Sequence, residues 1–216
     1  MSRVDVVKQI KDTGIIPVVR ASSADEAMRA IDAIRDGGIS VLEITMTVPG
    51  AVALIEQVAA TCGPDVLVGA GTVLDPETAT ACISAGAKFV VSPALNLDTI
   101  ACCQRHDVAA MPGALTPTEV VQAWNAGADL VKVFPAGAVG GPSYLKALKA
   151  PLPHIELVPT GGVSLTTAGD FIRAGAAALG VGTDLVDINA IREGQSAVIT
   201  ERAKQFIEIV REARVS

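Results

Sequence analysis

The chain has 216 residues, of which 50% are hydrophobic and 3% aromatic, and its formal net charge is -6. This length and apolar content predict one domain with a sizeable aliphatic core, spanning residues 1–216. The acidic balance and the lack of a basic tract argue against nucleic acid as a partner, and no apolar run reaches the roughly 20 residues that span a bilayer, so we expect no membrane association.

Short aliphatic runs alternate with longer Ala-rich amphipathic runs from one end of the chain to the other. Residues 1–13 predict a short helix, and over residues 23–35 the side chains of Ala27, Ile31 and Ile34 form one apolar helix face. The aliphatic runs predict eight strands, which lie at residues 15–20, 41–45, 66–69, 89–92, 108–111, 130–134, 156–160 and 177–181.

Local signals mark the ends of several predicted helices. Ser23 with Glu26, and Thr116 with Glu119, have the spacing of a capping box, in which each side chain bonds the backbone N–H of the other residue. Small-Gly pairs end several helices, because glycine accepts the left-handed conformation that turns the chain into the next strand. The segments that begin at these pairs are alike at residues 85–91, 126–132 and 174–179.

These repeated turn-and-strand segments predict an α/β fold. About eight β/α units in roughly 200 residues is the number expected for a closed (β/α)8 barrel. We therefore predict a single-domain TIM barrel with a short N-terminal helix. An open doubly wound sheet is the alternative. The first strand lacks the Gly-rich turn expected of such a sheet, because residues 20–23 read Arg-Ala-Ser-Ser.

The cysteines and histidines show no metal-type arrangement. His106 and His154 do not pair with a cysteine or a carboxylate at ligand spacing. We interpret the cysteines as reduced thiols of a cytoplasmic protein, and residues 1–5 lack the apolar segment of a signal peptide. We therefore expect no metal and no cofactor. The cysteines are Cys62, Cys82, Cys102 and Cys103.

Lys132 and Glu43 are ionisable residues inside otherwise aliphatic strands. Removing water from an ammonium group favours the neutral amine, the nucleophile that Schiff-base chemistry on a ketone requires. Lys132 shares its strand face with Leu130 and Phe134, whereas the opposite face is purely aliphatic and should meet the helices. Both ionisable side chains should then point into the barrel, as an amine catalyst and a proton shuttle. The alternative is a structural ion pair without catalysis.

Glycine-rich turns end the last two predicted strands. Gly161 and Gly162 follow the seventh strand, and Gly182 and Thr183 follow the eighth. Backbone N–H groups at such turns can bind a phosphate, and the seventh and eighth loops are the usual phosphate site of these barrels. Tight turns without a ligand are the alternative.

Other strand ends carry candidate substrate-binding residues. Arg20 ends the first strand, where a guanidinium either binds a carboxylate or phosphate or is an exposed charge. Thr72 follows the glycine-rich end of the third strand and offers a hydroxyl to a substrate oxygen. Phe134 shares the face of Lys132 and can wall the pocket, and Pro93 ends the fourth strand as a substrate-binding or turn residue.

Six short motifs lie at the strands and their ends, and they read Leu42-Glu43-Ile44-Thr45, Val68-Gly69-Ala70-Gly71-Thr72-Val73, Val91-Ser92-Pro93, Met111-Pro112-Gly113, Lys132-Val133-Phe134-Pro135 and Pro159-Thr160-Gly161-Gly162. In this order they resemble the class I 2-keto-3-deoxy-6-phosphogluconate (KDPG) aldolases, over residues 15–186. The resemblance implies a metal-independent barrel aldolase of the Entner–Doudoroff pathway, usually a homotrimer. Its ligands would be a 2-keto-3-deoxy sugar acid phosphate and pyruvate.

The resemblance also implies a role for each site residue. Lys132 matches the Schiff-base lysine and Glu43 the acid/base. Thr72 matches a residue near the pyruvate carboxylate, and Thr160 matches a position where threonine accompanies the gluconate rather than the galactonate substrate. The phosphate site matches Gly161, Gly162, Gly182 and Thr183.

One position departs from this resemblance. Many members have an arginine shortly after the glutamate strand, where this chain has Thr47. The chain is similar to the branch with a Thr-Val-Pro run and an arginine at the end of the first strand. Arg20 is therefore expected to supply the missing cation.

Several alternatives stay open at the level of the sequence. Two keep the aldolase chemistry and take 4-hydroxy-2-oxoglutarate or 2-keto-3-deoxy-6-phosphogalactonate as the substrate. A phosphosugar isomerase or epimerase would use Glu43 as a base and Lys132 as an electrostatic group, without a covalent adduct. A small-molecule-binding barrel would bind its ligand without turnover.

Overall fold

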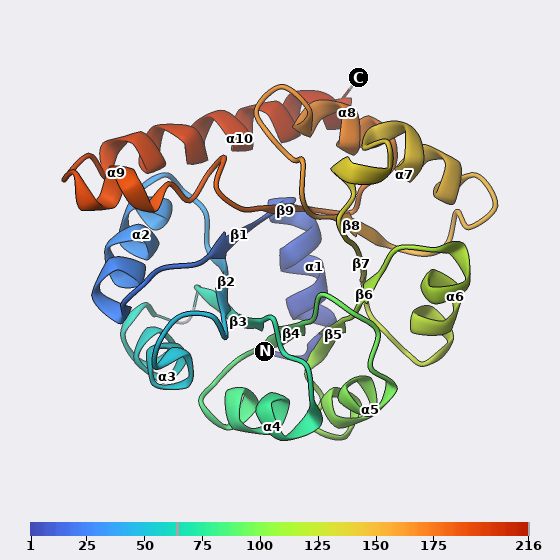
Figure 1. The fold of residues 1–216 in the computed structure, drawn as a ribbon, viewed down its shortest axis with the longest axis horizontal. Helices are drawn as coiled ribbons and strands as arrows, with labels where there is room; N and C mark the ends of the chain where they lie inside the picture. Colours follow the sequence, from blue (N-terminus) through green and yellow to red (C-terminus); the bar gives the residue numbers. More distant parts are fainter. Residues whose placement is uncertain (64, 216) are drawn as a thin grey trace.

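Parallel strands form a ring at the centre of the molecule, and helices surround this ring (Figure 1). The computed structural model describes residues 1–63 and 65–215. One hydrogen-bonded sheet has the order β5-β4-β3-β2-β1-β9, and a second has the order β6-β7-β8. The strands are β1 (Ile15–Val19), β2 (Val41–Thr45), β3 (Leu67–Gly71), β4 (Phe89–Val91), β5 (Ala109–Met111), β6 (Gly113–Ala114), β7 (Val131–Val133), β8 (Leu157–Pro159) and β9 (Leu179–Val181).

The described strands occupy eight positions around the ring, because β5 and β6 are two parts of one strand. Pro112 separates these parts, since proline has no N–H to donate to a sheet ladder. On the opposite side, isolated parallel bridges join β8 to β9, one of them between Thr160 and Gly180. β1 pairs in parallel with both β2 and β9, so the ladder is continuous across this part of the ring. The predicted α/β barrel is confirmed, although two interruptions divide its hydrogen-bonded ladder.

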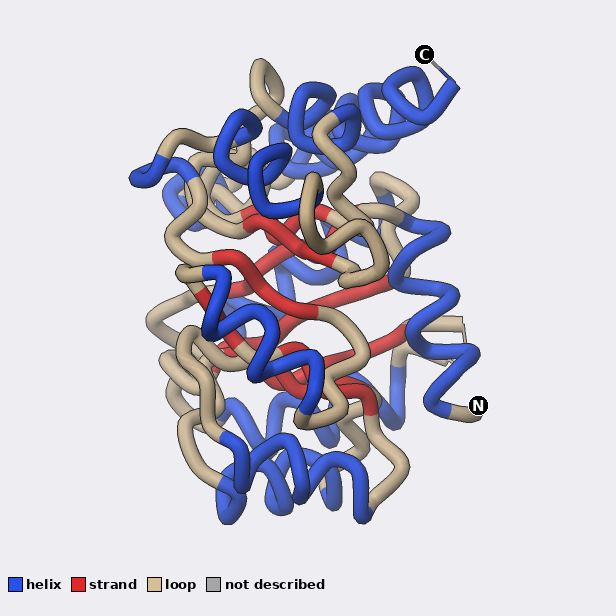
Figure 2. Tube along the Cα trace, turned by 90° about the vertical axis from the view of Figure 1, so that its right-hand side faces the viewer, coloured by secondary structure: helices blue, strands red, loops and turns tan. Residues whose placement is uncertain are grey.

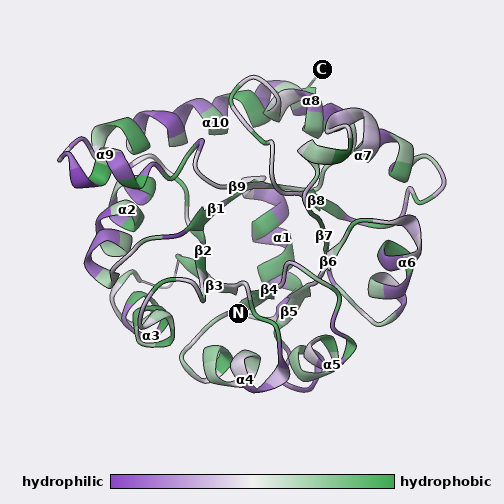
Figure 3. Cartoon of the chain, in the orientation of Figure 1, coloured by the Kyte–Doolittle hydropathy of each residue, from purple (hydrophilic) through white to green (hydrophobic). Residues whose placement is uncertain are grey.

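Helices alternate with the strands, and Figure 3 shows hydrophobic residues concentrated in the strands and hydrophilic residues mainly on the surrounding helices. Helix α10 packs against α2 and α8 along one outer edge (Figure 1). The helices are α1 (Arg3–Thr13), α2 (Ala24–Asp36), α3 (Ala51–Thr61), α4 (Pro76–Ser84), α5 (Leu97–Arg105), α6 (Pro117–Asn125), the 3-10 helix η1 (Gly137–Val139), α7 (Pro142–Lys149), α8 (Ala168–Arg173), α9 (Ile188–Arg192) and α10 (Ala197–Val215).

The buried apolar residues form two layers that follow the predicted alternation of side chains. Val131 and Val133 belong to the outer cluster, between the strands and the helices. Leu130 belongs to the inner cluster, together with Val6 and Ile10 of α1. Helix α1 therefore covers one end of the barrel, as Figure 2 shows from the side, and the inward faces of the strands line the interior.

One predicted helix start differs in detail from the structure. Ser23 does cap α2, because its side chain accepts a hydrogen bond from the Glu26 N–H. The Glu26 carboxylate, however, accepts from the backbone N–H and hydroxyl of Ser22 and from Arg192 of α9. The predicted capping box at Ser23 is therefore wrong in one half, whereas the box of Thr116 is complete.

Candidate active site

Lys132 lies at the centre of the short strand β7, with its side chain inside the barrel. Its backbone N–H donates to the Pro112 carbonyl at 2.9 Å, and its register partner on β8 is Val158. Only 2% of the residue is exposed, and Nζ lies 5.4 Å from the centre of the Phe134 ring. The β7 ladder on both sides and the aromatic ring position this amine, and the electron-rich ring face is an attractive neighbour for a cation.

Glu43 occupies the matching place on β2 and is also 2% exposed. Its atom Oε1 is buried and has no hydrogen-bond partner among the described residues. A Cβ atom at Gly71 would overlap this carboxylate, so glycine at the end of β3 leaves the room that the carboxylate occupies. A buried polar atom without a partner destabilises the fold, and such groups concentrate at functional sites.

The two ionisable residues face each other from opposite sides of the ring. β2 and β7 are four strand positions apart in a ring of eight, as Figure 1 shows. None of the ion pairs between described residues joins Lys132 to Glu43. The structural ion pair considered from the sequence is therefore not the arrangement found, and the two groups converge on the same interior space.

A small pocket of about 150 Å³ opens beside this space. It brings together most of the residues predicted to contact the substrate or its phosphate. Gly161 and Gly162 both have left-handed backbone conformations, with φ of 83° and 77°, which only glycine adopts freely. The predicted residues that line the pocket are Arg20, Phe134, Thr160, Gly161, Gly162, Gly182 and Thr183.

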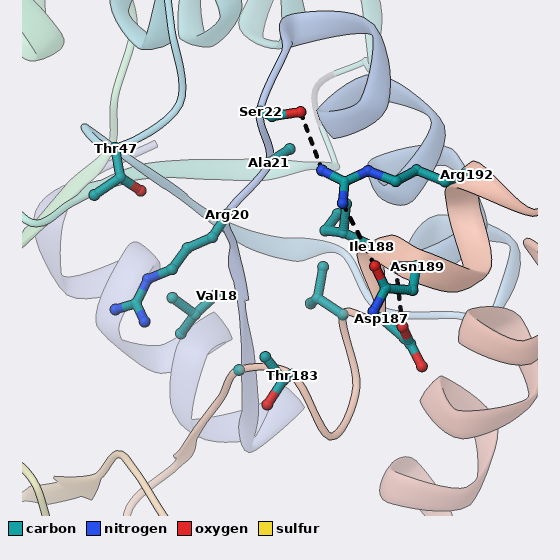
Figure 4. Close-up of a pocket in the computed structure, with 12 residues that line it drawn as sticks. Val18, Arg20, Ala21, Ser22, Thr47, Thr183, Asp187, Ile188, Asn189 and Arg192 are labelled. Carbon is teal, nitrogen blue, oxygen red and sulfur yellow. Dashed lines mark hydrogen bonds between the residues drawn. The ribbon is translucent and has the colours of Figure 1, made fainter.

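A larger groove of about 560 Å³ adjoins the small pocket and shares Val18, Arg20, Gly182 and Thr183 with it. Figure 4 shows the Arg20 side chain extending into the opening, between Val18 and Thr47. Arg20 is exposed and has no hydrogen bond or ion pair to any described residue. Its guanidinium is thus available to an anion at the junction of the two cavities.

Thr72 lies directly after β3 and Pro93 two residues after β4, and neither lines these two cavities. Thr72 has a φ of 60°, an unfavourable conformation for a β-branched residue. Backbone strain of this kind persists where the surrounding structure imposes it, often at functional sites. Lys132 and Glu43 do not line these cavities either. Phe134 links Lys132 to the small pocket, because its ring contacts Lys132 and also lines that pocket.

The sequence did not indicate Arg192 as a site residue, although it lines the larger groove. Its Nε donates to the Glu26 carboxylate at 2.8 Å, across 166 positions of the chain. Hydrogen bonds from Arg192 and then Ser22 lower the pKa of Glu26 to about 2. No local spacing could have revealed this pair, because it depends on the packing of α9 against α2.

No group of three or more His, Cys, Asp or Glu side chains in the described part of the chain is arranged to hold a metal ion. None of the helices within residues 1–63 and 65–215 is both long and apolar enough to cross a membrane.

Comparison with known proteins gives consistent matches over nearly the whole chain. The family model "KDPG and KHG aldolase" matches residues 6–202. The 2-dehydro-3-deoxy-phosphogluconate aldolase of Treponema pallidum is 33% identical, over 96% of this chain and 98% of its own. The 2-dehydro-3-deoxy-6-phosphogalactonate aldolase of Escherichia coli K12 is 36% identical, over 92% and 95%.

A solved structure adds a chemical observation about a relative. The KDPG aldolase of Legionella pneumophila, solved with pyruvate captured at low pH as a covalent carbinolamine intermediate, has a TM-score of 0.85 to this chain. It is 30% identical, and the match covers 92% of this chain and 96% of that one.

Proposed function

Since the chain belongs to the KDPG and KHG aldolase family, it is an aldolase, a lyase of carbon–carbon bonds, and we propose that it cleaves 2-keto-3-deoxy-6-phosphogluconate. The products would be pyruvate and glyceraldehyde 3-phosphate. The observation that carries the proposal is the pair of buried, inward-facing residues Lys132 and Glu43 on opposite strands of the barrel, with an unpartnered oxygen on Glu43.

Lys132 acts as the nucleophile in this mechanism. Its free amine attacks the C2 ketone to form a carbinolamine, and loss of water gives an iminium ion. Glu43, directly or through a water molecule, removes the proton of the C4 hydroxyl. The C4–O electrons form the aldehyde, and the electrons of the breaking C3–C4 bond pass into the iminium, which leaves an enamine on Lys132.

The second half of the reaction returns the enzyme to its starting state. Glyceraldehyde 3-phosphate leaves, and the carboxylic acid of Glu43 gives its proton to C3 of the enamine. Water then adds to the regenerated iminium, and its collapse frees pyruvate and the Lys132 amine. Glu43 is suited to both transfers because it already lies, without a hydrogen-bond partner on Oε1, in the interior that Lys132 faces.

The small pocket is the proposed site for the phosphorylated end of the substrate. Its glycine turns at Gly161–Gly162 and Gly182 offer backbone groups, Thr183 offers a hydroxyl, and Arg20 offers a cation. Arg20 thereby takes the place of the family arginine that is absent at Thr47. The pocket also includes Thr160 and Phe134, which would contact the middle of the substrate.

Thr72 and Pro93 are the proposed neighbours of the pyruvate half of the substrate. They follow β3 and β4, on the part of the ring that does not line the small pocket. In the proposed binding mode the phosphate lies at one side of the barrel mouth and the carboxylate at the other, with the C3–C4 bond between Lys132 and Glu43.

The galactonate analogue is the second candidate substrate. A relative that is 36% identical carries the name of the phosphogalactonate aldolase, whereas threonine at position 160 favours the gluconate substrate by resemblance. Cleavage rates with the gluconate, the galactonate and 4-hydroxy-2-oxoglutarate, compared as kcat/KM, distinguish the three. The proposal predicts the highest value for the phosphorylated gluconate.

The setting of the enzyme is also part of the proposal. The family resemblance supports a homotrimer of one barrel domain per chain, acting in the cytoplasm in the Entner–Doudoroff pathway. Light scattering of the purified protein measures the trimer directly, and a monomeric mass would contradict that part.

The decisive test is reductive trapping. The EDTA-treated protein is incubated with pyruvate and sodium borohydride, and the product is weighed intact and mapped by peptide mass spectrometry. The expected result is one carboxyethyl group on Lys132 and none in Lys132→Met. A folded wild-type protein that gains no adduct would support the non-covalent isomerase or binding alternatives instead.

A further inference from the structure

The loop that carries Arg20 is held at both of its ends. At the β1 end, the Thr45 hydroxyl donates to the Val19 carbonyl at 3.1 Å. At the α2 end, the backbone N–H and hydroxyl of Ser22 donate to one oxygen of the Glu26 carboxylate at 3.1 and 2.8 Å. Only Arg20 and Ala21 lie between these attachment points, so the Glu26 carboxylate helps to constrain the Arg20 backbone.

Arg192 of α9 determines in turn where the Glu26 carboxylate lies. Its Nε donates to Oε1 of Glu26 at 2.8 Å, and its NH2 donates to Oε2 at 3.3 Å and to the Ser22 hydroxyl at 3.1 Å. This forked contact constrains direction as well as distance. Figure 4 shows Arg192 next to Ser22 on the wall of the larger groove, with Arg20 on the other side.

The two arginines of this groove are in opposite states. Arg192 also donates to the Asn189 side chain at 3.4 Å, so each of its nitrogen atoms already has a partner. Arg192 and the Glu26 carboxylate form an ion pair at 2.8 Å, and this contact helps to lower the pKa of Glu26 to about 2. Arg20 has no partner among the described residues. The hydrogen-bonding groups of Arg192 are therefore occupied by protein partners, and Arg20 is the cation available to a ligand.

We infer that Arg192 is a positioning residue, which acts through Glu26 and Ser22 to hold Arg20 at the anion-binding pocket. The inference rests on the proposed function for the identity of the anion, a sugar phosphate. The positioning of Arg20 should affect the binding of any phosphate in the small pocket. Docking α9 onto α2 is the plain structural role against which it must be tested. That role predicts a loss of stability only.

Arg29 offers a matched control for the structural role. Its guanidinium also joins α2 to α9, by donating to the Ile191 carbonyl at 3.3 Å. It makes no hydrogen bond or ion pair to Ser22 or Glu26 in the described structure, so Arg29→Ala weakens the same helix contact without releasing the Arg20 loop.

The first measurement is the binding of inorganic phosphate by calorimetry, which needs no catalysis. In Arg192→Ala we expect Kd to rise about tenfold, because the displaced Arg20 makes a weaker charge-assisted contact with phosphate, and in Arg20→Ala, which removes that contact, we expect binding to be lost. Arg29→Ala should bind like the wild type. An unchanged Kd in folded Arg192→Ala overturns the inference, and so does a wild-type protein that binds no phosphate.

The second measurement is kinetic and separates this inference from the proposed function. Arg192→Ala should raise KM for the phosphorylated substrate with little change in kcat, while borohydride trapping of pyruvate on Lys132 stays at the wild-type level. Arg192→Lys keeps the charge but not the forked contact, so its KM should lie between those of the wild type and Arg192→Ala. If borohydride trapping falls in Arg192→Ala by as much as KM rises, the variant has a general structural defect, and the positioning role is refuted. If pyruvate is not trapped in the wild type, the proposed function is wrong. The phosphate-binding measurement still tests the positioning role, because it does not depend on catalysis.

Discussion

Lys132 and Glu43 project into the barrel from strands on opposite sides of the ring, and no ion pair between described residues neutralises one with the other. Each is 2% exposed. A buried acid and a buried amine that do not pair leave both groups available to a reactant placed between them. This arrangement supports the proposed catalytic roles of the two residues over a structural ion pair.

Replacing the proposed nucleophile should abolish turnover without unfolding the protein. Lys132→Met keeps a long unbranched side chain in the same space, so we expect native circular dichroism and no measurable aldol cleavage, because Lys132 is the only buried lysine among the described residues. A coupled assay for pyruvate release makes the measurement. Activity near the wild-type level would rule out Lys132 as the Schiff-base residue.

Glu43→Gln tests proton transfer separately from Schiff-base formation. We expect kcat to fall by about 10²–10⁴-fold, the usual contribution of a general acid–base group, while pyruvate still forms a borohydride-trapped adduct on Lys132. The thermal midpoint should not decrease, because the amide replaces a buried carboxylate with an unpartnered oxygen. A variant that retains most of its kcat would assign the proton transfer to another group.

Gly71→Ala tests whether the position of the Glu43 carboxylate matters. The new Cβ would overlap that carboxylate, so the side chain must move, and we expect kcat to fall about 10²-fold, as for other small misplacements of a catalytic group. A crystal structure of the variant should show Glu43 displaced. If Glu43 moves and kcat does not change, the carboxylate position is not critical.

The Glu26–Arg192 contact should contribute to stability in a defined pH range. The pKa of Glu26 falls from 4.5 to about 2 in the folded chain, mainly through hydrogen bonds from Arg192 and Ser22. A lowered carboxyl pKa stabilises the fold above the unfolded value, and this stabilisation is lost as the pH falls toward the folded value. The thermal midpoints of the wild type and Glu26→Gln should therefore differ at pH 7 and converge between about pH 4.5 and 2. A difference that is independent of pH would contradict this assignment.

The cysteines should react slowly in the native protein. Burial raises the pKa of Cys103 to about 12 and that of Cys82 to about 11, and all four cysteine residues are buried. Because the thiolate is the reactive form, we expect labelling by a disulfide reagent at pH 8 to be slow until the chain is unfolded. Rapid labelling of the folded enzyme would show that the helices around these residues open readily.

Much of the barrel could be predicted from local patterns in the sequence. Every predicted strand overlaps an observed one, and β2 has the predicted bounds. The assignment of Val131 and Val133 to the outer layer also followed from alternation alone, because side chains of a strand point to opposite faces. Among the described strands, only β6 had no prediction of its own, because the predicted fifth strand ended at residue 111 and β6 begins after Pro112.

The sequence by itself determined the repeated β/α pattern, the inward direction of Lys132 and Glu43 and the family motifs, because each depends on residues close together in the chain. The tertiary structure alone decided that Lys132 and Glu43 do not pair with each other, that Arg20 has no partner among the described residues and that Arg192 binds Glu26. Those relationships join residues up to 166 positions apart. Their geometry depends on how strands close into a ring and how α9 packs on α2, which no local period encodes.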